Sequence, residues 1–187
     1  RIERQNSDRP PELKPEERYV SIAKNGKEAL AYYHGICGEN PESWLLKGNA
    51  TINGKPLVSN GRLRVFGTEV FRPNIILACL LLEMEHRCRQ MGMADLKFRY
   101  ITTTAHKPGA HGLGLAADFD PNENELDSVH EGTWNLPIAF ARLGQQMGFK
   151  WGMYFDKSRD DENADPMHLE VRTSLPEAMA LLTSPDA

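Results

Sequence analysis

The stretch GAHGLGLAADFD, residues 109–120, combines a histidine, closely spaced glycines and an aspartate in one short segment. His111 and Asp118 lie seven positions apart, with Gly112 and Gly114 between them. Glycine permits tight turns and close backbone approach, so the chain can double back and bring the imidazole towards the carboxylate. Neutral imidazole and carboxylate are two of the ligand types that zinc prefers. We therefore expect a turn that leads into a strand, with His111 and Asp118 as two metal ligands.

A second segment, DENADPMHLEV at residues 161–171, supplies the missing ligand. Catalytic zinc usually has three protein ligands and one open position, and His168 lies in a predicted strand of this segment. Asp165 precedes it by three residues, across Pro166, which suits a general base acting on the water that zinc activates. We expect Glu170 to hold the second ring nitrogen of His168, because ligand imidazoles usually donate that N–H to a carboxylate or carbonyl.

The patterns on either side of these motifs predict both helices and strands. We expect helices at about 24–34, from Pro73 to Gly92, within 135–149, and from the capping box Ser174–Glu177 onward. We expect strands within 96–104, 113–120, 150–155 and 167–171, and a hairpin or small meander at 51–67 around two Asn-Gly pairs. Adjacent strands should be antiparallel. The predicted class is α+β, a small, mostly antiparallel sheet with helices packed on it.

With 187 residues, the chain is long enough for one domain with a sizeable core. Residues 1–18 are polar and proline-bearing, which predicts a tail or linker. Residues 19–187 form the expected domain, with a helix and hairpin segment at about 19–72 and a metal-binding core at about 73–171. The polar tail fits a segment left after removal of a signal or anchor.

Charge and cysteine content exclude several classes of function. The formal net charge of −4 gives no reason to expect binding to nucleic acid, whose binders usually carry a basic face, or to an anionic membrane. No apolar run approaches the ~20 residues of a membrane span. The cysteines are Cys37, Cys79 and Cys88. Cys79 and Cys88 should point to opposite sides of one helix, so they cannot bridge each other. Cys37 could pair with either, although we expect three separate thiols.

The metal-site motif also resembles a known family. The pattern H-x-x-G-x-A-x-D followed by D-x-x-H is formed by His111, Gly114, Ala116, Asp118, Asp165 and His168. It resembles the zinc D-alanyl-D-alanine carboxypeptidases and L-alanyl-D-glutamate endopeptidases, which include VanY-type carboxypeptidases and phage endolysins and share their zinc core with Hedgehog domains. The resemblance covers about 73–171. It implies a Hedgehog-like fold with His111, Asp118 and His168 as zinc ligands and Asp165 as the base.

Two positions depart from the family's pattern. Gly109 stands where the family usually has serine, and the segment before His111 lacks the arginine that polarises the scissile carbonyl and binds carboxylate. Lys107, His106 and Arg99 are the candidates for that cationic role, although a lysine offers no bidentate fork. Trp151 resembles a tryptophan found upstream of the family's second histidine motif. Aromatic residues of this segment are more often part of the core, although Trp151, Tyr154 and Phe155 are candidates for the border of the substrate cleft.

These observations predict a zinc peptidase that hydrolyses amide bonds in peptidoglycan stem peptides, as a carboxypeptidase or an endopeptidase. The peptidoglycan substrate is implied by the resemblance, and so is a periplasmic, exported or phage-delivered location. The alternative is a non-catalytic zinc module that binds peptidoglycan or a protein in a cell-wall, secretion or phage assembly. Residues 19–72 would then be a docking face for a protein partner. Asp165 favours the enzyme, because a structural site needs no base beside its ligand.

Overall fold

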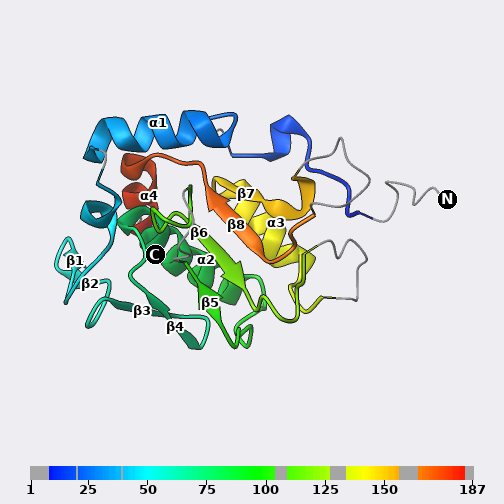
Figure 1. Ribbon diagram of the computed structural model, residues 1–187. Helices are drawn as coiled ribbons and strands as arrows, with labels where there is room; N and C mark the ends of the chain where they lie inside the picture. Colours follow the sequence, from blue (N-terminus) through cyan, green and yellow to red (C-terminus); the bar gives the residue numbers. More distant parts are fainter. Residues whose placement is uncertain are drawn as a thin grey trace.

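A four-stranded antiparallel sheet forms the centre of the molecule (Figure 1). The computed structural model describes residues 9–19, 21–38, 40–103, 109–126, 134–155 and 164–183. Across the sheet, the order of the strands is β5 (Ile101–Thr102), β6 (Ala116–Phe119), β8 (His168–Val171) and β7 (Phe149–Trp151). Helices pack on this sheet, so the arrangement is α+β with a small antiparallel sheet, which confirms the predicted class.

The two faces of this sheet differ in chemistry, because successive side chains along a strand point to opposite sides. Leu169 and Val171 of β8 are at most 1% exposed and belong to the hydrophobic core, whereas His168 and Glu170 alternate with them. Figure 1 shows α2 and α3 behind β6 and β8. A Cβ at Gly144 of α3 would lie 3.2 Å from Leu169, so this helix packs directly on the apolar face. The opposite face is left for polar side chains.

Four helices occur in the described part of the chain: α1 (Gly26–Cys37), α2 (Ile75–Gln90), α3 (Ile138–Gln146) and α4 (Leu175–Leu182). All four confirm helices predicted from the sequence. Nine of the sixteen residues of α2 are buried, and the helix contacts both α3 and α4. Its N-cap is Asn74, so Pro73 precedes the cap and does not occupy the first turn as predicted. Gly92, with φ +81°, follows the end of the helix as expected.

The segment between α1 and α2 contains the short 3-10 helix η3 (Pro41–Trp44) and two hairpins. The hairpins are β1 (Thr51–Ile52) with β2 (Lys55–Pro56), and β3 (Arg62–Val65) with β4 (Thr68–Phe71). Asn53-Gly54 forms the first hairpin turn, as predicted. Asn60-Gly61 instead makes a turn just before β3, and the second hairpin turns at Phe66-Gly67.

Two predicted strands are shorter than expected. The strand predicted at 96–104 is reduced to the two residues of β5. The one predicted at 150–155 ends at Trp151 and continues as the 3-10 helix η4 (Gly152–Tyr154). This change of conformation bends the chain directly beside the start of β8, since Gly152 accepts a hydrogen bond from the backbone of Asp165.

Residues 9–19, which include the 3-10 helix η2 (Pro15–Glu17), lie against the body of the domain. The Tyr154 hydroxyl donates to the carbonyl of Pro10 at 2.6 Å, and Arg142 donates to the carbonyl of Pro11. Residues 9–18 of the predicted tail or linker therefore contact the domain, and residues 1–8 lie outside the described residues. The proline-rich segment holds its place because its carbonyls accept hydrogen bonds from side chains of the domain.

The cysteines and the apolar helices agree with the sequence. All three cysteines are free, with Cys37 exposed on α1 and Cys79 and Cys88 buried on α2. Burial raises the pKa of the Cys79 thiol to about 12 and that of Cys88 to about 11, so both stay protonated. Among the described residues, no helix combines the length and the apolar character needed to cross a membrane.

Candidate metal centre

The register of the central sheet brings together two of the predicted ligands. Asp118 of β6 and His168 of β8 are direct cross-strand partners, although they lie 50 residues apart in the sequence. Side chains of directly opposed residues share one face of the sheet. The distance from His168 Nδ1 to Asp118 Oδ1 is 3.0 Å.

The third predicted ligand comes from the turn before β6. His111 lies in this turn, where its carbonyl accepts from the backbone N–H of Gly114 at 3.0 Å. Gly114 has φ +66°, and a Cβ there would lie 2.6 Å from Leu45 Cδ2 and 2.8 Å from the backbone nitrogen of Asn74. A larger residue would therefore displace the turn. This is the close backbone approach that the sequence predicts for a glycine beside His111.

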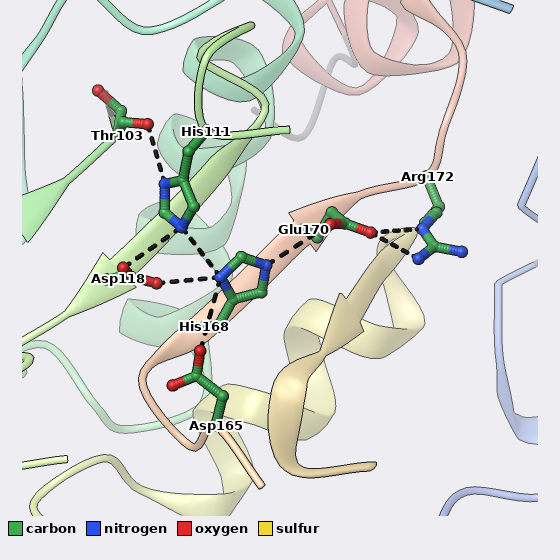
Figure 2. A network of polar contacts seen from close by, with 7 residues as sticks. All are labelled: Thr103, His111, Asp118, Asp165, His168, Glu170 and Arg172. Atoms are coloured by element: carbon green, nitrogen blue, oxygen red, sulfur yellow. Dashed lines mark hydrogen bonds and ion pairs between the residues drawn. The ribbon is translucent and has the colours of Figure 1, made fainter. Parts of the chain in front are cut away.

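The side chains of His111, Asp118 and His168 converge on one point (Figure 2). His111 Nε2 lies 3.1 Å from His168 Nδ1 and 3.3 Å from Asp118 Oδ2. One donor atom from each residue lies within 4.8 Å of the other two. The three residues predicted as metal ligands are thus brought together, on the face of the sheet opposite the core.

Each histidine is oriented by a partner on its other ring nitrogen. His111 Nδ1 lies 3.0 Å from the carbonyl oxygen of Thr103, an acceptor, so in the neutral form that binds metals this nitrogen carries the proton and Nε2 keeps a lone pair. His168 Nε2 lies 3.6 Å from Glu170 Oε1, and the guanidinium of Arg172 donates to Glu170 Oε2 at 2.9 and 2.5 Å. Glu170 therefore has the supporting position that the sequence predicts.

Charge coupling shifts the pKa values of these groups strongly. Burial alone would raise the pKa of Asp118, but the neighbouring imidazoles of His111 and His168 outweigh burial and lower it to about 2. Burial would lower the pKa of His168, and the neighbouring carboxylates of Asp118 and Glu170 instead raise it to about 9. Burial would also raise the pKa of Glu170, which His168 and Arg172 lower to about 2. Both carboxylates are therefore ionised at neutral pH, one on either side of the His168 ring.

Asp165 lies at the edge of this cluster. Its Oδ2 is 4.0 Å from His168 Nδ1, the ring nitrogen that faces the other two ligands. The loop that carries it is fixed by Gly152, whose carbonyl accepts from the Asp165 N–H at 2.9 Å. A Cβ at Gly152 would lie 3.0 Å from the Cβ atoms of Asp165 and His168, so the η4 segment can approach this closely only with glycine.

The donor set fits a zinc ion. Two imidazole nitrogens and one carboxylate oxygen are typical zinc ligands, and three protein ligands leave the open position of a catalytic site. Partners on the outer ring nitrogens, here Thr103 and Glu170, are the usual support of ligand histidines. Within the described ranges, His111, Asp118 and His168 are the His, Cys, Asp or Glu residues whose donor atoms lie close enough together to hold a metal ion.

Among the described residues, the other predicted site residues Arg99, Trp151 and Tyr154 are not gathered at this cluster. Lys107 and His106 lie outside the described residues. Arg99, with 72% of its side chain exposed, faces Glu123 at 3.8 Å. Trp151 has no exposed surface, and its indole N–H donates to the Pro166 carbonyl at 2.9 Å. It therefore supports the Asp165 loop and offers no surface to a substrate. Tyr154 is 7% exposed and is turned towards Pro10.

Phe155 is the aromatic residue that lies beside the metal ligands. Its ring centroid is 5.1 Å from that of His168, and its side chain is partly exposed. The ammonium of Lys150 lies 5.1 Å from the same ring. Of the aromatic candidates for the border of the cleft, Phe155 is therefore the one that lies at the ligands, whereas Trp151 and Tyr154 are buried.

Comparisons of the chain with protein-family models, with curated proteins and with solved structures give no match. The function is therefore inferred from the chemistry of the site and from the spacing of its residues.

Proposed function

We propose that this chain is a zinc-dependent peptidase that hydrolyses amide bonds in the stem peptides of bacterial peptidoglycan. The observation that carries the proposal is the convergence of His111, Asp118 and His168 within 4.8 Å, with Asp165 4.0 Å from His168. Three ligands plus an adjacent carboxylate are what hydrolysis at a zinc site requires. The peptidoglycan substrate, and with it a location in the bacterial envelope or delivery by a phage, is supported by the resemblance of the motif.

The metal has a defined role in this proposal. Zinc held by His111, Asp118 and His168 would supply a Lewis acid that polarises the scissile carbonyl and lowers the pKa of water towards neutrality. The chain's own residues prepare that site. Thr103 and Glu170 fix the two imidazole rings so that His111 Nε2 and His168 Nδ1 face inward.

Proton transfer is assigned to Asp165. A carboxylate oxygen of Asp165 takes a proton from the attacking water as the new C–O bond forms at the scissile carbonyl. The same carboxyl then donates this proton to the leaving amine when the C–N bond breaks. The backbone contacts of its loop with Gly152 hold the carboxylate near the ligands throughout, so no rearrangement is needed between the two transfers. Lys107 or His106 remains the proposed partner of the oxyanion.

The test combines zinc content with digestion of purified muropeptides followed by mass spectrometry. The wild-type protein should bind about one zinc ion per chain and cleave one amide bond in the stem peptide. Asp165→Asn should retain zinc and lose roughly 100-fold or more of the rate, because the general base is gone. Asp95→Asn, at an exposed position after α2, is the matched control and should cleave like wild type.

Two other outcomes would redirect the proposal. If zinc is bound and neither form cleaves, the non-catalytic binding module becomes the better explanation. If the purified protein neither contains nor takes up zinc, His111, Asp118 and His168 do not form a metal centre, and the peptidase proposal fails with them.

A further inference from the structure

A cavity of about 530 Å³ lies beside the metal cluster, between α1 and the turn that carries His111. One wall is formed by Ala29, Leu30 and Tyr33 of α1. The opposite wall is formed by Gly109 and Ala110, the two residues directly before His111. A cavity of this volume is typical of a binding site for a small ligand.

The cavity adjoins the metal cluster at two of its lining residues. Glu170 lines it and also faces His168 Nε2 at 3.6 Å. Ala110 lines it and directly precedes the ligand His111 in the chain. A peptide positioned over the three ligands would therefore have this cavity within reach on one side of its reacting bond.

The lining is mainly apolar, with polar groups at the rim. Ala29, Leu30 and Tyr33 of α1 and Ala110 of the facing turn contribute apolar side chains to it. Asn25 and Lys27 also line the cavity and are exposed to solvent. Apolar walls favour aliphatic side chains, whereas the Lys27 ammonium and the Asn25 amide suit a carboxylate or a peptide group at the rim.

The wall contributed by α1 is held firmly to the sheet. The buried Tyr33 hydroxyl donates to the carbonyl of Thr173 at 2.7 Å, and Ile22 N–H donates to the carbonyl of Arg172 at 3.0 Å. Asn25 caps the helix by accepting from Glu28 N–H at 3.1 Å. The cavity is thus largely preformed, which reduces the ordering that a ligand must bring about on binding.

We propose that this cavity is a substrate subsite that binds the aliphatic part of the peptide on one side of the cleaved bond, with Lys27 at its rim facing a substrate carboxylate. The inference rests on the proposed peptidase function. It gives the segment before α2 a role in substrate selection, in place of the docking face for a protein partner that the sequence suggests as an alternative.

The experiment fills the cavity from the α1 side. Leu30→Trp should raise the KM for the muropeptide by about tenfold or more and leave zinc content and kcat nearly unchanged, because remote apolar binding is lost. Ile36→Trp is the matched control, since Ile36 lies on the same helix, is 48% exposed and is not part of the lining. Lys27→Glu, an exposed position that folding should tolerate, should also raise KM for the anionic peptide.

Calorimetric titration of zinc-loaded protein with the same muropeptide separates this inference from the proposed function. The subsite is supported if wild type and Ile36→Trp bind the muropeptide with the same affinity and Leu30→Trp binds it about tenfold more weakly. This result does not depend on whether the bond is cleaved. Cleavage by wild type with an unchanged KM in both Leu30→Trp and Lys27→Glu overturns the subsite and leaves the peptidase proposal intact. Neither binding nor cleavage by wild type overturns both.

Discussion

Glu170 connects the ligand His168 to the buried guanidinium of Arg172. Its carboxylate lies between His168 Nε2 and the guanidinium of Arg172, whose side chain is 6% exposed (Figure 2). Glu170→Gln keeps the shape but removes the charge that favours the ring orientation of His168. We expect zinc affinity to fall about tenfold or more, measured by competition with a chelating dye. Glu69→Gln, in the exposed Arg62–Glu69 pair, should leave the affinity unchanged. An unchanged value for both variants would show that Glu170 does not support the metal.

At the residue scale, the sequence predicted the parts of the site that depend on local spacing. His111 and Asp118 share one short motif, and Asp165 and His168 share another, so each pair could be recognised within a few residues. The role of Phe155 depends on the bend of η4, where Gly152 approaches His168. That bend is imposed by tertiary contacts, and no local pattern encodes it. The predicted contact of Trp151 with substrate failed for the same reason.

Helix α2 is coupled to the His111 turn through its cap. The Asn74 side chain is 1% exposed, accepts from Ile76 N–H at 3.0 Å and donates to the carbonyl of Leu113 at 3.2 Å. Asn74→Ala removes the cap and leaves that carbonyl unpaired, so we expect unfolding free energy to fall by about 2 kcal/mol in urea denaturation. Zinc affinity should fall as well. Asn40→Ala, the exposed cap of η3, should lower the unfolding free energy by less than about 1 kcal/mol and should not change zinc binding.

At the element scale, helices were easier to predict than strands. Each of the four helices has an apolar face or a cap that can be recognised from neighbouring residues in the sequence, such as the capping box of Ser174 and Glu177. The second hairpin turn has no such signal, because Phe66 adopts φ +50°, which is unusual for a bulky residue. Phe66 is 2% exposed, and its N–H donates to Glu85 of α2 at 2.6 Å. Contacts with a distant helix therefore stabilise this turn.

At the scale of the whole molecule, the composition of the N-terminal segment does not indicate that it contacts the domain. Residues 9–18 are polar and rich in proline, yet the hydroxyl of the 7% exposed Tyr154 donates to Pro10 and Pro11. The acceptors are backbone carbonyls, which every residue carries, so the sequence gives no sign of the contact. The central sheet is antiparallel as predicted, and its register places Asp118 opposite His168.

The metal centre links distant parts of the chain, so zinc should stabilise the whole fold. His111 and His168 are 57 residues apart, and the unfolded chain cannot hold them within 4.8 Å of Asp118. A ligand that binds only the folded state at 100 times its dissociation constant adds about 2.7 kcal/mol of stability. For a chain of this length, we expect the melting temperature of chelator-treated protein to rise by about 5–10 °C when zinc is added. Differential scanning calorimetry measures this shift. Magnesium should cause none, because it prefers oxygen ligands, and His111→Ala should abolish the zinc effect. An equal shift in His111→Ala would mean that zinc binds elsewhere.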